Sequence, residues 1–467
     1  MLIRLTHVCA RWRQIIIACP TFWTHIKFGG KEMLPSLAKL FFERAEECAL
    51  DVHVSSGLVR RAPPTTEQVA LTLPPGKRIR TLSIKQSWVT IQEIISVWAD
   101  ALSPLQALEL NADESSLSSS RSTIFVGDAL MSLTLMGYAV PGLVYIRAPN
   151  LTAFRLYETS QTPCSATRLL DFLEAAPALE EVLIFTDSTI VGDFPPPERT
   201  VTLSYVQRIL FSIRHGPQLA LYLNCPSLKD TQLVNMFSDD PAVGVFPPSL
   251  QLLLGRYSIE TIDWVTMVVS DQEGHKNCSL QLRTPSGTTF LTACETAYVP
   301  EPFPSYSDED DEWTFSVLFD HAVSTLLSLS LGRVTGFSID IGYPPLDPTV
   351  DSTDIITKLA GVLEKCTNLH EVVLGNYLPS CFPVFSLDKI PSIQVLVIKH
   401  PQDVLWEELA ERVAEVARIR HSRGAPLHKI EIFMTEERPR IEGLEGWVQE
   451  VKYQAEPSRD NRRTSWS

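Results

Sequence analysis

Two residue pairs and one acidic run are of the types that bind metals or transfer protons. His421 and His428 lie seven residues apart around a Gly-Ala-Pro turn, and Cys366 lies four residues before His370. Residues 308–312 read DEDDE, whose carboxylates could bind a cation or a basic partner. Zinc ligands must converge in space, and calcium loops need alternating ligands and a glycine, which these patterns lack. We therefore expect two surface histidines, a Cys and a His on separate elements, a solvated acidic insertion, and no metal.

No short motif of an enzyme is present. The chain contains no G-x-S-x-G nucleophile turn, no G-x-x-x-x-G-K-[ST] phosphate loop, no G-x-G-x-x-G and no H-E-x-x-H. We expect a protein that is not an enzyme, with no catalytic residues and no cofactor. The alternative is an enzyme whose site is assembled from dispersed residues, which would need a pocket that joins several titratable groups.

The composition argues against several classes of protein. The 467 residues carry a formal net charge of −15, which repels phosphate backbones, so we expect no nucleic-acid partner. No apolar run approaches the roughly 20 residues that span a bilayer, and Arg11 and Arg13 interrupt the apolar N-terminal stretch. We therefore expect no membrane partner and no secretory signal. The nine cysteines form no C-x-x-C pair, which indicates a reduced intracellular compartment, the cytoplasm or the nucleus.

One pattern recurs along the chain: an apolar residue followed by apolar residues three and five positions later. The middle residues of successive copies are 21 to 28 residues apart, a period typical of leucine-rich repeats. The last two positions lie on a short strand and point to one side, where stacked strands bury them together. The copies are Ile79–Leu82–Ile84, Leu105–Leu108–Leu110, Leu130–Leu133–Leu135, Leu151–Phe154–Leu156, Leu179–Val182–Ile184, Val206–Ile209–Phe211 and, more weakly, Leu228–Thr231–Leu233.

Between these strands the apolar spacing changes to that of a helix. Residues 167–177, TRLLDFLEAAP, and 357–366, TKLAGVLEKC, each place leucines on one helical face. A proline then precedes the next strand signal by two residues in several places, because proline cannot continue a helix. These prolines are Pro149, Pro177, Pro226 and Pro391. We therefore predict an α/β fold, a curved leucine-rich-repeat solenoid of irregular parallel strand–helix repeats.

The repeat pattern weakens after residue 234 and then returns. Leu250–Leu253 and Leu280–Leu282 are partial copies, and the asparagine that often follows the last leucine by three residues is missing throughout. We therefore expect no side-chain ladder of the standard form. The later copies are Val334–Phe337–Ile339, Leu369–Val372–Leu374, Ile393–Leu396–Ile398 and Leu427–Ile430–Ile432.

The C-terminal part of the array ends in a predicted amphipathic helix at residues 406–420. Its apolar face would carry Leu409, Val413, Val416 and Ile419. Together with a strand at residues 427–432, this helix would cap the edge of the array.

The N-terminal residues 5–23 read LTHVCARWRQIIIACPTFW and predict a short helix that stops at Pro20. The segment resembles the second half of an F-box, which reads L-x-x-V-C-x-x-W-R-x-I-x-x-x-x-P-x-x-W. The matching residues are Leu5, Val8, Cys9, Trp12, Arg13, Ile15, Pro20 and Trp23. Followed by the repeats, it is similar to the F-box and leucine-rich-repeat proteins found in fungi. The resemblance covers about residues 2–28 for the F-box and 75–435 for the repeats.

This resemblance implies a receptor subunit of a ubiquitin ligase. Its F-box helices would dock on a Skp-type adaptor of a cullin ligase, and the repeats would hold an unknown protein substrate. Leu5, Val8, Cys9, Trp12, Ile15, Pro20 and Trp23 would lie in or beside the adaptor-binding fold. The first helix of the family would lie before Met1, so a scaffold that no longer binds the adaptor stays open as an alternative. The same residues could instead cap the N-terminal edge of the solenoid.

Four segments follow from this interpretation. They are a partial F-box at residues 1–30, a connecting or capping segment at 31–74, the solenoid at 75–435 with an acidic loop near 300–313, and a largely disordered tail at 436–467. Residues 113–123, rich in serine, and 192–200, rich in proline, would be loops.

Overall fold

The computed structural model is a mixed α/β structure with a large, mostly parallel sheet, which confirms the expected class at that level. The chain divides into two units, which we call unit 1 (Met1–Leu228) and unit 2 (Lys229–Ser467). The structure describes residues 9–28, 35–55, 78–112, 125–137, 146–158, 165–186, 199–212, 216–235, 262–272, 275–284, 289–298, 319–320, 322–342, 352–375, 382–385, 390, 392–399, 406–434 and 439–455.

Unit 1 contains a parallel sheet whose strands follow one another in chain order. The strands are β1 (His25–Phe28), β2 (Leu50–Ser55), β3 (Ile79–Gln86), β4 (Ala107–Ala112), β6 (Ser132–Gly137), β8 (Ala153–Glu158), β9 (Glu181–Thr186) and β11 (Arg208–Ser212). The predicted register is confirmed, since the middle position of each copy pairs with that of the next. The paired residues are Leu82, Leu108, Leu133, Phe154, Val182 and Ile209.

A repeated turn leads into most of these strands, and we call a strand together with the residues that lead into it a rung. The N–H of Leu130 donates to the carbonyl of Gly127 at 3.0 Å, and that of Leu151 donates to Ala148 at 3.2 Å. Met131 directly follows the first apolar residue, Leu130. Its carbonyl accepts hydrogen bonds from two backbone N–H groups of the next rung, those of Thr152 at 2.8 Å and Ala153 at 2.9 Å. The first apolar residue of the pattern therefore fixes the corner and the link between rungs.

Side-chain hydrogen bonds accompany this backbone pattern at some turns. Asn150 donates to the carbonyl of Asp128 in the preceding turn at 2.7 Å, and Thr152 Oγ1 donates to Met131 at 3.0 Å. In unit 2, Asn368 donates to the carbonyl of Gly332 at 2.6 Å from the same place in its rung. These two asparagines lie just before the first apolar position rather than after the strand, at positions that the sequence pattern did not single out.

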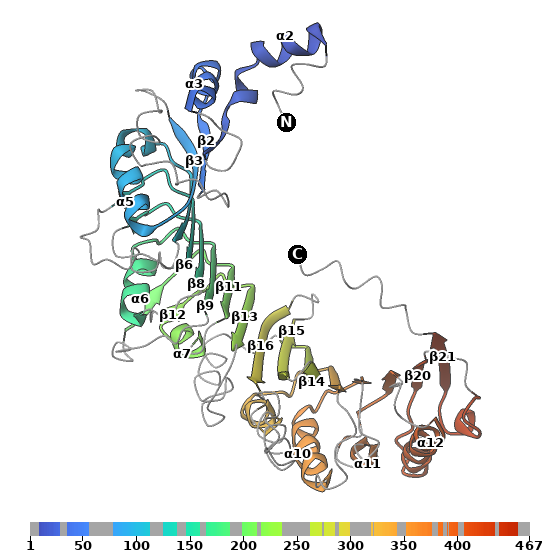
Figure 1. Ribbon diagram of the computed structural model, residues 1–467. Coiled ribbons are helices and arrows are strands. Elements are labelled where there is room, and N and C mark those ends of the chain that lie inside the picture. The colour runs from blue at the N-terminus through green and yellow to red at the C-terminus, as the bar shows by residue number, and fades with distance from the viewer. Residues whose placement is uncertain are drawn as a thin grey trace, which may run out of the picture. The chain divides into compact units, whose positions relative to one another are not determined.

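Three of the helices of unit 1 lie along one face of its sheet (Figure 1). They are α5 (Trp88–Val97), α6 (Ala166–Glu174) and the short α7 (Gly216–Ala220). The predicted helix at residues 167–177 is confirmed by α6, whose Leu169, Leu170 and Leu173 are buried. Phe172 of α6 contacts Phe154 of β8, with ring centroids 4.8 Å apart. We call the opposite face, onto which the alternate strand residues project, the open face of unit 1.

Two small strand pairs lie outside this sheet. β5 (Phe125–Val126) pairs with β7 (Ile146–Arg147), and β10 (Val201–Thr202) pairs with β12 (Leu223–Asn224). Both pairs are parallel and belong to the connections between rungs.

The rungs begin well before residue 75, which corrects the expected start of the array. The 3-10 helix η1 (Pro20–Trp23) leads directly into β1, and the carbonyl of Thr24 accepts the N–H of Asp51 at 2.9 Å. This is the same link as between later rungs, so Trp23 occupies the first apolar position of the first rung. The segment expected to connect or cap instead contains α3 (Pro35–Arg44) and β2.

Unit 2 departs from the expected strand–helix alternation. The strands β14 (Trp264–Gln272), β15 (His275–Arg283) and β16 (Thr289–Tyr298) form an antiparallel meander. Gln272 pairs with His275, which leaves no room for the crossover that parallel strands need. The prediction of parallel repeats throughout is therefore wrong here, and Leu280–Leu282 lies in the middle antiparallel strand.

The meander enters the sheet in reverse order. β13 (Asp230–Asn235) pairs in parallel with β16, and β14 pairs in parallel with β17 (Gly336–Gly342). Beyond it, parallel strands again follow in chain order, namely β17, β18 (Glu371–Leu374), β19 (Val395–Lys399), β20 (Lys429–Met434) and β21 (Glu450–Ala455).

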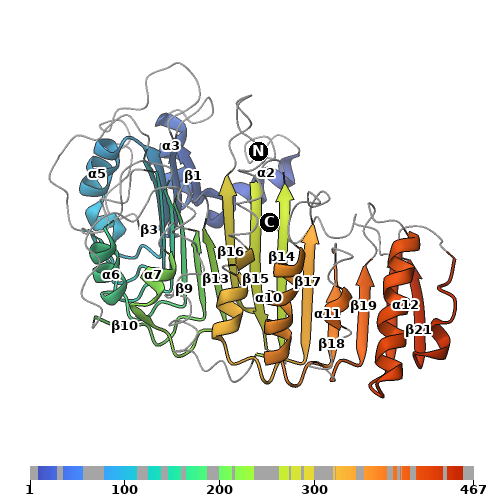
Figure 2. The same ribbon diagram turned by 90° about the horizontal axis from the view of Figure 1, so that it is seen from below.

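The helices α10 (Ser352–Lys365), α11 (Phe382–Phe385) and α12 (Trp406–Ser422) lie on one face of these strands (Figure 2). Leu409, Val413 and Val416 of α12 are buried as predicted. Ile419, however, is half-buried, and its neighbour Arg420 is buried in its place.

The array continues beyond residue 435, where a tail was expected. The 3-10 helix η7 (Leu444–Gly446) precedes β21, which pairs with β20. The first register pair joins Lys429 to Glu450, and the last joins Met434 to Ala455. The helix and strand expected to cap the edge are therefore followed by one more strand. The expected acidic loop, the loop at 113–123, most of that at 192–200 and the residues after 455 lie outside the described residues.

Candidate binding surfaces

The helix α2 (Ala10–Ala18) begins at Cys9, whose Sγ accepts the N–H of Trp12 at 3.5 Å. Such a cap satisfies one of the N–H groups that a helix leaves unpaired at its start. Pro20 then begins η1, since its fixed φ suits the first position of a helical turn. The sequence expectation of a short helix that stops before Pro20 is confirmed.

Most of the apolar side chains of this segment face solvent. Trp12 is 50% exposed and Ile15 47% exposed, and Ile17 and Phe22 are also exposed, whereas Ile16 is buried. Large apolar side chains gathered on a surface usually mark a contact with another molecule. Of the residues assigned by resemblance, Cys9, Trp12 and Ile15 are therefore exposed together on α2 or its cap. Leu5 and Val8 lie outside the described residues.

Trp23 lies apart from this exposed group, in the interior of unit 1. Its Nε1 donates to the carbonyl of Ile16 at 2.7 Å, and its ring meets Phe41 edge-on with centroids 5.0 Å apart. The guanidinium of Arg44 lies 4.6 Å from the ring centroid on its face. Trp23 therefore joins α2 to the sheet through α3, and Pro20, half-buried, begins the connecting turn.

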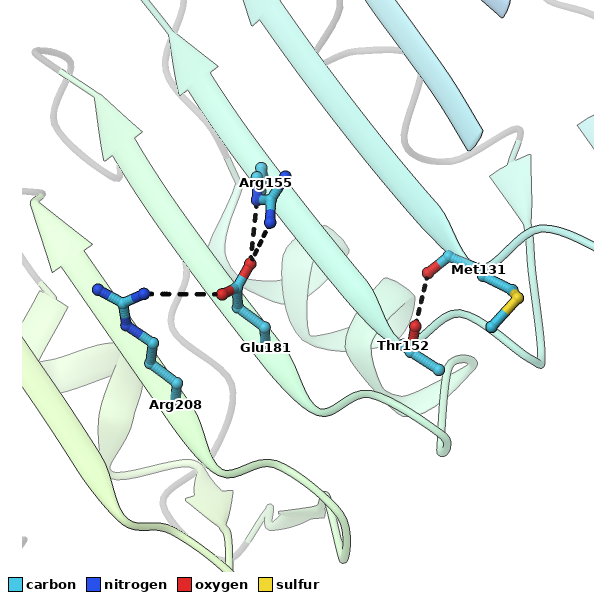
Figure 3. A network of polar contacts seen from close by, with 5 residues as sticks. All are labelled: Met131, Thr152, Arg155, Glu181 and Arg208. Atoms are coloured by element: carbon cyan, nitrogen blue, oxygen red, sulfur yellow. Dashed lines mark hydrogen bonds and ion pairs between the residues drawn. The ribbon is translucent and has the colours of Figure 1, made fainter. Parts of the chain in front are cut away.

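A polar network crosses three neighbouring strands on the open face of unit 1 (Figure 3). Arg155 of β8 donates from Nε and Nη2 to Oε1 of Glu181 on β9, at 3.0 and 2.7 Å. Arg208 of β11 places Nη1 3.8 Å from the other carboxylate oxygen. Farther along the same strands, the rings of Tyr157 and Phe185 stack with centroids 5.0 Å apart and an interplanar angle of 7°. The sequence interpretation did not identify these residues.

The outward positions of β2 to β4 bring together groups that could act in acid–base chemistry. Nδ1 of His53 and Oγ of Ser83 lie 2.9 Å apart, and Glu109 follows Ser83 in the register. Burial lowers the pKa of His53, the charge of Glu109 raises it, and Lys27 lowers it, with a net shift below 6.5. In a catalytic triad the histidine lies between the nucleophile and the carboxylate. Here the serine lies between the other two, so the arrangement is not that of a triad.

Two ion pairs of unit 2 each form within a single strand. Lys429 forms an ion pair with Glu431 two residues along β20, and Lys452 lies 2.9 Å from Glu450 on β21.

The residues first considered for metal chemistry do not converge. Burial raises the pKa of Cys366 to about 12, and its Sγ donates to the carbonyl of Val362 at 3.5 Å, while His370 is exposed. His421 and His428 are exposed at the end of α12 and before β20. Within the described part of the chain, no three His, Cys, Asp or Glu side chains gather in a metal-binding group. The acidic run at 308–312 lies outside it.

Among the described helices, none combines the length and the apolar character that a membrane crossing requires. No protein-family model matches the sequence. A comparison with curated proteins also gives no match.

Proposed function

We propose that this protein is a substrate-recognition subunit of a Skp-cullin-F-box type ubiquitin ligase. In this proposal the rungs form a leucine-rich-repeat solenoid that binds a target protein, and α2 belongs to a partial F-box that docks on the adaptor. The protein performs no chemistry of its own, because its role is to hold the target near the ligase.

The observation that supports this proposal most directly is the exposure of Trp12 and Ile15. The two side chains lie three residues apart and so on the same side of α2. Burying a large aromatic and an aliphatic side chain at an interface gives a substantial part of the affinity of many complexes. Trp23 and Ile16, which carry the same chemistry, are already used inside unit 1.

The two tryptophans of the N-terminal segment have different roles in this proposal. Trp23 is held by Phe41, by Arg44 and by its hydrogen bond to Ile16, so it anchors the end of α2 to the first rung. Trp12, at the other end of the helix, is free of the core and exposed. A partner bound to α2 would therefore be connected to the rungs through the packed side chain of Trp23.

A binding experiment with the purified chain and a purified Skp-type adaptor tests the proposal. We expect a complex that the double substitution Trp12→Ala with Ile15→Ala weakens by about tenfold or more. Val97→Ala removes an exposed aliphatic side chain from α5 and serves as the matched control, which should leave binding unchanged. If the unsubstituted chain fails to bind, or if the control weakens binding equally, the adaptor role is wrong.

The alternative is a scaffold of repeats that does not bind the adaptor. It shares the target-binding face with the leading proposal and differs only in the role of α2. A chain that retains a protein ligand on its open face but shows no affinity for the adaptor would favour this alternative.

A further inference from the structure

The open face of unit 1 carries a group of arginine, aromatic and leucine side chains on β8, β9 and β11. We call it the Arg–aromatic patch, and its residues are Arg155, Tyr157, Leu183, Phe185, Arg208 and Leu210. Phe154 and Leu156 of β8 point to the helices, and successive strand residues alternate between faces, so Arg155 and Tyr157 lie on the open face. The register continues this face to Leu183, Phe185 and Leu210.

The patch has an apolar centre and a cationic rim. Leu183 and Leu210 pair in register and are buried, although they lie on the face opposite the helices. The stacked rings of Tyr157 and Phe185 border them on one side. Arg155 lies beside Leu183 in the register, and Arg208 lies two residues before Leu210 on β11; their side chains are 41% and 45% exposed. Aromatic and arginine side chains around a dry centre are enriched where proteins bind one another.

The charge of the patch is opposite to that of the whole chain. The open-face positions of these three strands hold two arginines and one carboxylate, Glu181, whereas the chain has a formal net charge of −15. Arg155 uses Nε and Nη2 on Glu181, and a guanidinium has five N–H donors, so it keeps donors for a second carboxylate. The surplus of positive charge on the patch favours an acidic ligand.

We propose that the Arg–aromatic patch binds an extended acidic segment of a partner protein, with carboxylates on Arg155 and Arg208 and a leucine or aromatic side chain against Tyr157 and Phe185. This inference rests on the proposed function, because it names the class of target that the rungs would hold. It depends on residues far along the chain from α2, so the two proposals can fail separately.

Selection from a random dodecapeptide phage library on the immobilised full chain tests the inference. The expected peptides are rich in Asp and Glu around a leucine or an aromatic residue. A synthetic, fluorescein-labelled copy of the best peptide then gives a dissociation constant by anisotropy. Arg155→Glu with Arg208→Glu, and separately Tyr157→Ala, should weaken it by about tenfold or more.

A substitution expected to strengthen binding guards against effects of misfolding. Glu181→Gln removes the charge of a carboxylate that contacts both arginines, so the acidic peptide should bind severalfold more tightly. Arg440→Glu and Tyr205→Ala change exposed residues elsewhere and should leave the dissociation constant unchanged. Selection of neutral or basic peptides, no selection at all, or acidic peptides that ignore the patch substitutions would each overturn the inference.

The adaptor experiment separates this inference from the proposed function. Patch substitutions should leave adaptor binding intact, and Trp12→Ala with Ile15→Ala should leave peptide binding intact. Peptide binding without adaptor binding supports the patch and contradicts the ligase role, and the reverse result contradicts the patch alone.

Discussion

The indole ring of Trp264 lies directly over Gly336, its register partner on the neighbouring strand of unit 2. A β-carbon placed on Gly336 would overlap the six-membered ring, so the close approach depends on the missing side chain. The meander and the parallel strands after it meet at this contact, because Trp264 begins β14 and Gly336 begins β17.

Gly336→Ala should therefore destabilise the protein. Forcing an added methyl group into a filled site costs about 1–3 kcal/mol, which urea unfolding followed by circular dichroism would measure. In a Trp264→Leu background the same change should cost much less, because the overlap is gone. Gly446→Ala, where nothing lies near the added carbon, is the control. Equal costs in both backgrounds would contradict the proposed overlap.

Arg420 should be needed for the stability of the C-terminal part of unit 2. Its buried guanidinium donates to the carbonyls of Phe385 at 3.2 Å, Ile390 at 3.1 Å and Ile393 at 2.9 Å. Arg420→Met leaves these acceptors without that donor and should lower the free energy of unfolding by about 3 kcal/mol. Arg412→Met, which breaks an exposed pair with Glu415 on the same helix, should cost less than about 0.5 kcal/mol. Similar losses in the two variants would count against the role of Arg420.

The two tryptophans of the N-terminal segment should differ in their effect on stability. Trp23→Ala removes a side chain that is 1% exposed and should cost about 3–5 kcal/mol. Trp12→Ala removes a half-exposed side chain and should change the unfolding midpoint by little. Thermal unfolding of both variants checks this, and a large loss from Trp12→Ala would place that side chain in the core instead.

The protonation of His53 should respond to its neighbours in a defined direction. Burial lowers its pKa below 6.5, so its contribution to stability is present above pH 6.5 and is lost as pH falls through the folded value. Glu109→Gln should lower this pKa further, and Lys27→Met should raise it. NMR titration of the imidazole resonances measures each value. A shift in the opposite direction for either variant would refute the assigned cause.

Asn368→Ala tests a side-chain hydrogen bond that links two neighbouring turns of unit 2. The hydrogen bond from the Asn368 side-chain amide to the carbonyl of Gly332 is 2.6 Å long and exposed, so its loss should cost about 1 kcal/mol. Thr367→Val removes a longer bond, 3.2 Å, to the same carbonyl and should cost less. The reverse order in urea unfolding would make the threonine the more important link between the turns.

The register of unit 1 could be predicted because burial imposes it. Leu82, Leu108 and Leu133 must all point to the helix side, and a shift of one residue would turn each toward solvent. The meander could not be predicted in the same way. Leu280 and Leu282 alternate with polar residues as they would in a parallel strand, so the local pattern does not reveal the direction of the neighbour.

The candidate sites depend on contacts that the local sequence does not contain. Nothing in the N-terminal motif shows that Trp23 is buried and Trp12 exposed, because Phe41 and Arg44 of α3 decide it. The predicted face of α12 included Ile419, but the carbonyls of Phe385, the last residue of α11, and of Ile393, just before β19, favour burial of Arg420. Tyr157 and Phe185 lie at outward positions of their strands, where the residue types do not repeat from one strand to the next. The repeat pattern therefore did not single them out.

The reversed order of the meander also constrains how unit 2 can assemble during synthesis. β13 pairs with β16, the last strand of the meander, and not with β14, the strand that follows it in the chain. A nascent chain that has only reached β14 therefore leaves that edge of β13 without its native neighbour, and closing the longer loop costs more entropy than joining adjacent rungs. Unit 2 cannot grow by adding one strand after another from the N-terminal side. β13 gains this neighbour only when the chain has been made as far as β16.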